Sequence, residues 1–321
     1  MKRLMLATSL ALTVLAVAAC GNEQSNANAA DADAKAAQIA YEKQILAWRA
    51  ARVQRLTKPD GWLSLVGMHW IEVGNTRVGA AADNGTRLSV GPPHVGVVKL
   101  EKDGTISFQP EKDAGITIDG QPAVGVADLI SDADPAAEKT VVGFNKGDAG
   151  FVVIQRGDRY ALRVRDALAP TRTGFSGIPY FAIDPAFRLK AKFTPHAPGS
   201  KIDIVNILGM VAPMDNPGTV TFEKDGKAYT LEAVDEGDHQ LFLIYADRTS
   251  GHESYAAARS LYAEYPDAQG NTIVDFNQGY NPPCAFTAYS TCPMPPLQNR
   301  LDLAITAGEK KPLKPGTAVV N

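Results

Sequence analysis

Short runs in which apolar and polar residues alternate are the feature that most limits how this chain folds. Val98 and Leu100 alternate with polar neighbours, and Ile106 and Phe108 resume the alternation beyond Asp103-Gly104. A period of two places one face of a strand in a core, and Asp-Gly is a preferred hairpin turn. The spacing therefore predicts an antiparallel hairpin in a chain built mainly from β-strands.

Further runs of this kind lie on both sides of a Gly- and Pro-rich segment at 166–185. Strands are expected before it at 87–90, 116–118, 141–144, 151–155 and 160–164, and after it at 202–208, 220–222, 229–231, 241–245 and 301–306. Such spacing is typical of sandwiches and barrels. The expected fold class is mainly β with two β-rich domains: an N-terminal β-sandwich over 61–170, and a C-terminal antiparallel sheet or barrel with long motif-bearing loops over 171–321.

One amphipathic helix is expected ahead of the sandwich, over 36–60. Tyr41, Ile45 and Trp48 share a helical face, and the Pro59-Asp60-Gly61 sequence ends the pattern. The preceding segment, 21–35, contains only small and polar residues. Since it has no large apolar side chain to bury against its ordering entropy, we expect a disordered tether there.

The first twenty residues have the layout of an export signal. Lys2-Arg3 precedes a mostly apolar run, Leu4 to Ala19, which is short for a membrane span and is followed by Cys20. The ending Val-Ala-Ala-Cys resembles the bacterial lipobox. The resemblance implies cleavage before Cys20, a diacylglycerol on its sulfur with palmitate among the acyl chains, and a membrane anchor. With Gly21 rather than Asp next, it also implies the periplasmic face of the outer membrane. An ordinary signal peptide with an incidental cysteine is the alternative.

Charge narrows the possible partners. Removing residues 1–20 takes away Lys2 and Arg3, so the formal net charge falls from −3 to −5. A mildly acidic chain without a basic block argues against nucleic acid as a partner. The expected partners are the lipid bilayer, through acylated Cys20, and a small-molecule or glycan ligand.

A dense motif lies between Asp247 and Arg300. It comprises Asp275-Phe276-Asn277, the run from Tyr280 to Thr287, Cys292-Pro293 and Asn299-Arg300-Leu301, with Asp247, Thr249-Ser250-Gly251, Glu253, Tyr255 and Arg259 upstream. Together with Gly61-Trp62-Leu63 and Gly67, this pattern resembles the bacterial and archaeal family called domain of unknown function 1684. The resemblance implies a common fold and a shared C-terminal site, and it implies no activity.

The first half also has a fainter likeness. Asn75 to Gly79, Pro92 to Val95 and Ile118-Asp119-Gly120 fall in an order similar to the forkhead-associated sandwich. The turn Arg77-Val78-Gly79-Ala80 departs from that family's phosphothreonine-reading loops, and no serine precedes His94. The likeness therefore implies a sandwich shape without phosphopeptide binding.

Several motif residues have side chains suited to chemistry. Asp247, His252, Glu253 and Asp275 are candidates for acid-base work or for holding a hard cation. The spacing fits no known metal motif, so the metal and any cofactor are left unspecified. The alternative is a structural role, in which Arg259 pairs with Asp275 or Glu253 and holds the loops together, since clusters of charged residues also occur in structural ion pairs.

Tyrosines and asparagines in the motif favour a pocket. The candidates for lining a pocket and stacking on a ring are Tyr255, Tyr262, Tyr280, Phe276 and Phe286, with Asn277 and Asn281 as polar partners. A hydrophobic core is the alternative, and it is favoured for the two phenylalanines. The leading hypothesis is a lipoprotein that binds a small molecule or envelope glycan. The alternatives are a hydrolase, possibly metal-assisted, that uses Asp247, Glu253 and Asp275, and a purely structural envelope protein, so enzyme status stays open.

Cys284 and Cys292 are the only cysteines left once Cys20 is lipidated. Two thiols outside a reducing compartment favour a disulfide. Free buried thiols, or one functional cysteine, are the alternatives.

Overall fold

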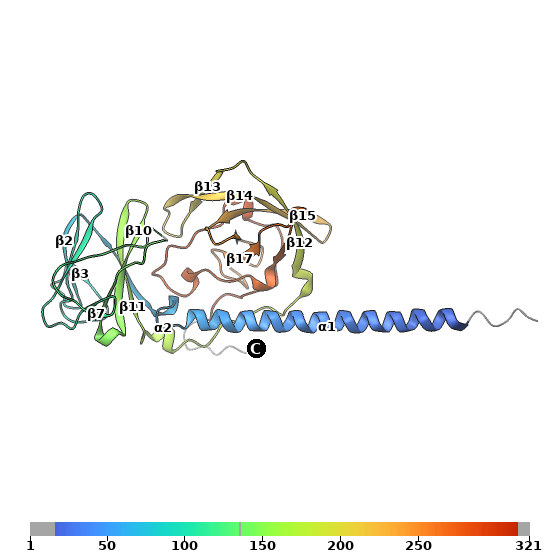
Figure 1. Ribbon diagram of the computed structural model, residues 1–321, viewed down its shortest axis with the longest axis horizontal. Coiled ribbons are helices and arrows are strands. Elements are labelled where there is room, and N and C mark those ends of the chain that lie inside the picture. The colour runs from blue at the N-terminus through green and yellow to red at the C-terminus, as the bar shows by residue number, and fades with distance from the viewer. Residues whose placement is uncertain (1–16, 135, 314–321) are drawn as a thin grey trace, which may run out of the picture. The chain divides into compact units, whose positions relative to one another are not determined.

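The computed structural model of the protein describes residues 17–134 and 136–313, with side chains described from residue 31 onward. The chain divides into two compact units, Met1–Ala47 and Trp48–Asn321. The described part of the first unit is helical, and the described strands all belong to the second (Figure 1). The predicted signal peptide, 1–20, falls mostly outside the described residues, and the Cys20 side chain is not among those described.

The helix α1 spans Val17–Leu56 and ends just before Pro59, as the pattern predicts. It also runs through 21–35, where the sequence predicts a tether. That stretch is rich in alanine, the strongest helix former, and contains no proline, so nothing in it stops the helix. Among the described residues, no helix is long and apolar enough to cross a membrane.

Two sheets form the N-terminal β-sandwich. One has six strands in the order β1-β11-β10-β9-β6-β7, and the other has five in the order β3-β2-β4-β5-β8. Their bounds are β1 Leu65–Ile71, β2 Gly74–Gly79, β3 Thr86–Arg87, β4 Gly96–Leu100, β5 Ile106–Pro110, β6 Thr117–Ile118, β7 Gln121–Pro122, β8 Ala127–Asp128, β9 Val141–Phe144, β10 Ala149–Arg156 and β11 Arg159–Asp166. The short helices η1 Trp62–Ser64 and η2 Asn145–Gly147 precede β1 and β10. The predicted hairpin is confirmed as the β4–β5 pair, in which Val98 lies opposite Phe108.

The two sheets enclose an apolar core. Leu162 and Val164 of β11 face this core, and Phe151 of β10 meets Phe108 of β5 edge to face, with the ring centroids 5.9 Å apart. Each such buried side chain stabilises the fold by about 1.5–3 kcal/mol. Because side chains alternate along a strand, Arg163 of β11 lies on the opposite face of its sheet.

The C-terminal domain is one seven-stranded sheet, with the order β17-β16-β15-β14-β12-β18 and with β13 beside β14. It follows α2 Pro170–Thr173 and η3 Pro185–Phe187, and its strands are β12 Arg188–Pro195, β13 Lys201–Val205, β14 Val211–Lys224, β15 Lys227–Asp235, β16 Gln240–Tyr245, β17 Arg259–Glu264 and β18 Asn271–Asp275. The hydroxyl of Thr272 in β18 donates to the carbonyl of Glu264 in β17 at 2.7 Å. Since this bond joins the two end strands, the sheet is a nearly closed barrel, and the mainly β fold class is confirmed.

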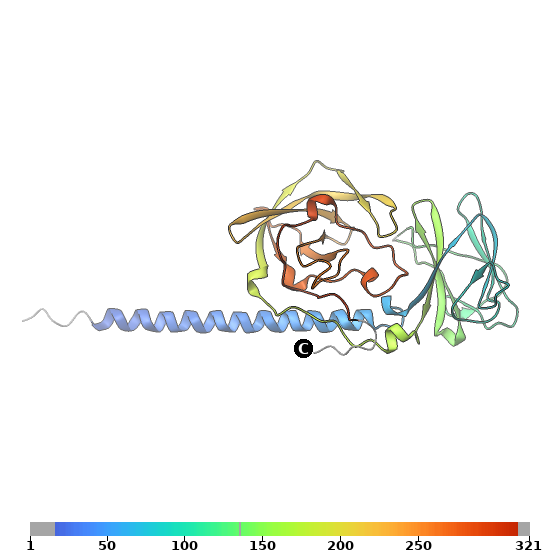
Figure 2. The ribbon, with the colours of Figure 1, turned by 180° about the vertical axis from the view of Figure 1, so that it is seen from behind.

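The segment after β18 fills one side of this barrel. It contains η4 Phe276–Gln278, η5 Pro283–Ala285 and η6 Leu297–Asn299, and Figure 2 shows it, in orange to red, winding across the strands. Phe276 packs edge to face on Tyr245 and Phe222, and Leu301 and Ile305 join the same core.

Two expectations for this region differ from the structure. The motif region contains the strands β17 and β18 where the sequence suggests loops. The strand predicted at 301–306 is wrong: the segment is irregular, because the carbonyl of Ile305 accepts a hydrogen bond from the Arg259 side chain instead of from a neighbouring strand.

Candidate functional site

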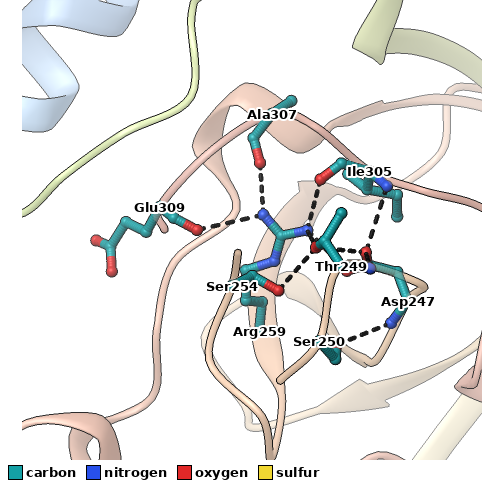
Figure 3. A network of polar contacts seen from close by, with 8 residues as sticks. All are labelled: Asp247, Thr249, Ser250, Ser254, Arg259, Ile305, Ala307 and Glu309. Atoms are coloured by element: carbon teal, nitrogen blue, oxygen red, sulfur yellow. Dashed lines mark hydrogen bonds and ion pairs between the residues drawn. The ribbon is translucent and has the colours of Figure 1, made fainter. Parts of the chain in front are cut away.

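A fully buried ion pair lies at the centre of the sequence motif. Arg259 opens β17 and Asp247 follows β16, and Nη2 of Arg259 lies 2.7 Å from Oδ2 of Asp247 with both side chains 0% exposed (Figure 3). The sequence predicts Asp275 or Glu253 as the partner of Arg259, and the structure corrects this to Asp247. Strand pairing explains the correction, because Tyr245 lies opposite Arg259 in the β16–β17 ladder and brings Asp247 alongside.

Three main-chain carbonyls complete the surroundings of Arg259. Nη2 donates to Ile305 O at 2.8 Å, and Nη1 donates to Ala307 O at 2.5 Å and to Glu309 O at 3.3 Å (Figure 3). Burial alone would lower the pKa of Arg259, but Tyr245, Asp247 and Glu309 outweigh burial and raise it. Arg259 therefore ties the irregular segment 305–309 to the barrel as a permanent cation.

The carboxylate of Asp247 is also fully engaged. Its Oδ1 accepts from the main-chain N–H of Thr249 at 2.7 Å and from the Thr249 hydroxyl at 2.6 Å, and that hydroxyl lies 2.8 Å from the Ser254 hydroxyl. A carboxylate that is sealed from solvent and held this way has no free lone pair facing an open site.

The turn that delivers the carbonyls to Arg259 depends on Gly308. Its φ is +78°, and a Cβ at this position would lie 2.4 Å from the carbonyl oxygen of Gly279. Only glycine fits both the left-handed conformation and this close approach.

Glu309 is a second buried centre, which sequence reasoning missed. Its side chain is 0% exposed, Oε1 accepts from Nε of Arg52 at 3.0 Å, and Oε2 accepts from the main-chain N–H of Asn281 at 2.7 Å. Burial raises the pKa of Glu309, with Arg52 acting in the opposite direction. The Glu-Lys-Lys run at 309–311 reads as a solvated surface, and only its neighbours in space show otherwise.

Asp275 and Asn277 form a separate cluster at the end of β18. Oδ1 of Asp275 accepts from the main-chain N–H of Asn277 at 3.0 Å and caps η4. The Asn277 amide exchanges two hydrogen bonds with the main chain of Asp184, which fixes the segment before β12. The hydrogen bonds of Asp275 and Asn277 described here therefore stabilise the fold.

The remaining predicted residues are dispersed. His252 and Glu253 are exposed in the turn after Thr249. Tyr255 donates to the carbonyl of Cys284 at 3.1 Å, and Asn281, which is 0% exposed, donates to the carbonyl of Lys310 at 2.7 Å. Across residues 17–134 and 136–313, no group of three or more His, Cys, Asp or Glu side chains is placed to hold a metal ion.

A cavity of about 490 Å³ lies beside these clusters, within the size range of small-molecule sites. It is bounded by the end of α1, the outer face of the six-stranded sandwich sheet, the barrel, and residues 283–293, which form the cysteine loop. Its lining includes Trp48, Arg52, Arg55, Trp62, Arg156, Arg163, Glu236, Phe242, Tyr262, Tyr280 and Cys292. Of the residues predicted to line a pocket, Tyr262 and Tyr280 are in this wall.

Arginines dominate the charge of the cavity. Arg52 pairs with Glu309, and Arg156 lies 3.0 Å from Asp132, but Arg163 is only 8% exposed and its Nε and Nη2 atoms have no hydrogen-bond partner among the described residues. Burial, together with Arg156, lowers the pKa of Arg163 to about 10, although Asp132 acts in the opposite direction. A buried cation whose N–H donors lack acceptors costs free energy unless a bound group accepts hydrogen bonds from them.

Aromatic rings make one wall of the cavity. Phe242 stacks on Tyr262 at 4.9 Å, Tyr262 stacks on Tyr280 at 6.2 Å, and Arg52 lies over the Tyr280 ring at 4.8 Å. On the other side, Arg163 lies 5.4 Å from the centre of the Trp62 ring. Such surfaces suit a planar or ring-bearing ligand with a negative group.

Cys292 lines the same cavity, and Cys284 lies next to it. Both are free thiols in the structure, and the main-chain N–H of Cys284 donates to Sγ of Cys292 at 3.1 Å. A hydrogen bond from the Cys284 thiol lowers the pKa of Cys292 to about 7, although burial raises it, and the Ser290 hydroxyl and Arg163 lower it further. The same thiol–thiol bond raises the pKa of Cys284.

Sequence reasoning missed the arginine cavity for a physical reason. Arg163 alternates with Leu162 and Val164, so the sequence places it on the outer face of the sheet. Outer faces usually meet solvent, and no local signal shows that this one is covered by the end of α1 and the cysteine loop.

Comparison with known proteins identifies the C-terminal part. Residues 173–310 match the family model described as "Protein of unknown function (DUF1684)", which confirms the resemblance for that region; Gly61 to Leu63 and Gly67 lie outside the match. No curated protein matches the chain. Among solved structures, a solution NMR structure of an uncharacterized protein from Haloarcula marismortui is 32% identical, with 43% of this chain and 78% of that chain covered and a TM-score of 0.37.

Proposed function

Because this chain belongs to the DUF1684 family, whose description assigns no activity, we propose a function from the site itself: the protein binds a small anionic molecule in the arginine cavity. The observation that carries the proposal is the pair of unpartnered donors on Arg163, a side chain only 8% exposed that lines the cavity. An anion there would give these donors charge-assisted hydrogen bonds, which are stronger than neutral ones.

The aromatic walls define the rest of the ligand. Trp62 on one side and Tyr280 on the other favour a flat ring or a sugar face next to the anionic group. A ring carrying a carboxylate or phosphate fits this description, whether it is a free small molecule or an acidic sugar of an envelope glycan.

The cellular location of the protein is part of the same proposal. We propose that the chain is cleaved before Cys20 and that Cys20 is acylated, palmitate being one of the attached chains, which makes the protein a lipoprotein held at the periplasmic face of the outer membrane. The lipobox-like ending before Cys20 and the basic Lys2-Arg3 pair support this. In that oxidising compartment we expect Cys284 and Cys292 to form a disulfide, and the hydrogen bond from the Cys284 main-chain N–H to the Cys292 sulfur supports this expectation.

A thermal-shift comparison of charged and neutral ring compounds tests ligand binding. Benzoate against benzamide, and galacturonate against galactose, separate charge from shape and a plain ring from a sugar. An anion at about a hundred times its dissociation constant should stabilise the protein by about 2.7 kcal/mol. The neutral twin should give little shift. Equal shifts for both members of each pair would refute the proposal.

The matched variants are Arg163→Met and Arg159→Met, two changes on the same strand. Arg159 is exposed over Trp70 and does not line the cavity. Arg163→Met should fold well, since it replaces a desolvated, unpaired cation with an apolar side chain of similar length. It should lose the shift with benzoate, whereas Arg159→Met should keep it.

A further inference from the structure

The two thiols of the Cys284–Cys292 pair have different surroundings. Cys292 is 5% exposed on the cavity wall; its sulfur accepts from the main-chain N–H of Cys284 at 3.1 Å, and its thiol donates to the Ser290 hydroxyl oxygen at 3.4 Å. Cys284 is half-buried, and the Tyr255 hydroxyl lies 3.6 Å from its sulfur. Both sulfurs therefore accept a hydrogen bond, from the Tyr255 hydroxyl and from the Cys284 main-chain N–H respectively, but of the two cysteines it is Cys292 that lines the cavity.

The surroundings favour ionisation of Cys292 over Cys284. The hydrogen bond from Cys284 lowers the pKa of Cys292 to about 7, so a larger share of this thiol than of an ordinary cysteine is thiolate near neutral pH. The thiolate is the attacking form in disulfide exchange, and an attacking thiol whose pKa is near the ambient pH is the most effective one.

The backbone holds both sulfurs in place. The carbonyl of Cys292 accepts from Ile207 N at 2.9 Å, and Met294 N donates to Val205 O at 2.8 Å, so Cys292 is tied to the end of β13. On the other side, Tyr255 holds the carbonyl of Cys284. Bringing the two sulfurs together needs no large movement of the chain, because the main-chain N–H of Cys284 already donates to Sγ of Cys292 at 3.1 Å.

We propose that Cys292 exchanges with a small anionic disulfide bound in the arginine cavity, and that Cys284 resolves the resulting mixed disulfide. The inference rests on the proposed function, since Arg163 would hold the negative group of the reactant beside the Cys292 sulfur. The ligand is then a small disulfide that carries carboxylate or similar anionic groups, and the cysteine pair is a redox-active dithiol.

The chemistry balances without a further reactant. The Cys292 thiolate forms a bond to one sulfur of the small disulfide, whose own S–S bond breaks, and one half leaves as a thiolate. The sulfur of Cys284 then attacks Cys292, the mixed disulfide breaks, and the second half leaves; the proton of Cys284 ends on one of the released halves. The cysteine pair loses two electrons and the small disulfide gains them.

The test uses dithiobis(nitrobenzoate), an aromatic disulfide with two carboxylates, and dithiodipyridine as its neutral counterpart. The full chain is reduced and carries Cys20→Ser, so that no third thiol reacts. This protein should release two equivalents of nitrothiobenzoate and keep no adduct. Cys284→Ser should release one equivalent and retain a mixed disulfide by intact mass. Cys292→Ser should react about tenfold more slowly at pH 7, since the remaining thiol is protonated.

Charge is tested separately. Arg163→Met should slow the reaction with dithiobis(nitrobenzoate) more than the reaction with dithiodipyridine, because the arginine both lowers the pKa of Cys292 and attracts the anionic reagent. Equal rates for Cys284→Ser and Cys292→Ser, or a native disulfide that dithiothreitol does not open, would overturn the inference in favour of a permanent staple. If benzoate stabilises the protein while Arg163→Met leaves both rates unchanged, the inference fails and the proposed function stands. If benzoate does not bind and the anionic reagent has no advantage, both fail.

Discussion

Replacing Arg259 by lysine tests whether the buried pair holds the C-terminal segment to the barrel. Lysine keeps the charge, and its single ammonium group can still reach Asp247. It cannot at the same time reach the carbonyls of Ile305, Ala307 and Glu309, which the planar guanidinium serves through two nitrogens. At least two buried carbonyls lose their partner.

The expected loss of stability follows from the number of buried carbonyls that lose their hydrogen-bond donor. Each buried acceptor left without a donor costs about 1–3 kcal/mol, so Arg259→Lys should lower the free energy of unfolding by about 2–6 kcal/mol. This loss is a large part of the free energy of unfolding of a typical folded domain, which is about 5–15 kcal/mol. Urea unfolding followed by far-ultraviolet circular dichroism measures the change.

The matched control is Arg248→Lys. Arg248 lies close to Arg259 in sequence, but it is exposed and pairs with the exposed Asp302. Its unfolding midpoint should stay where the wild-type midpoint is. If Arg259→Lys also unfolds at the wild-type midpoint with an unchanged slope, the buried carbonyl contacts do not stabilise the fold, and the reasoning fails.

Three further predictions concern other residues. Gly308→Ala should lower the free energy of unfolding by about 1 kcal/mol or more, because alanine is strained at φ +78° and its Cβ meets Gly279; an unchanged urea midpoint contradicts this. Burial raises the pKa of Glu309 in the folded state, so the folded protein binds the extra proton and the wild type should lose stability relative to Glu309→Gln as pH rises above the unfolded value of 4.5; a difference that is flat or grows with pH counts against it. Cys20→Ser should abolish labelling by a fatty-acid analogue in cells, and undiminished label would remove the lipoprotein proposal.

Local sequence patterns predicted much of the strand framework. The run 141–144 coincides with β9, and the hairpin around Asp103-Gly104 is β4 and β5, because alternation and turn chemistry act within a few residues. The strand expected at 301–306 is absent because the carbonyl of Ile305 accepts from the side chain of Arg259, 46 residues earlier, and no local pattern encodes that bond.

The candidate site was harder to predict than the strands. The motif pointed to Asp247 and Arg259, yet the structure shows them sealed together, and Glu309, the other buried carboxylate, sits in a run of charges that looks solvated. Burial decides which charged residue is structural and which is available to a ligand. Since burial comes from distant segments packing together, the sequence alone could not single out Arg163.

Selective quenching of tryptophan fluorescence tests the central claim most directly, namely that the cavity attracts anions through Arg163. Trp48 and Trp62 line the cavity, and a Trp70→Phe background removes the only other tryptophan. At constant ionic strength, iodide should quench these two residues more strongly than neutral acrylamide does, and Arg163→Met should lower the iodide constant while leaving that of acrylamide unchanged. An iodide constant that is the same with and without Arg163 would contradict the account.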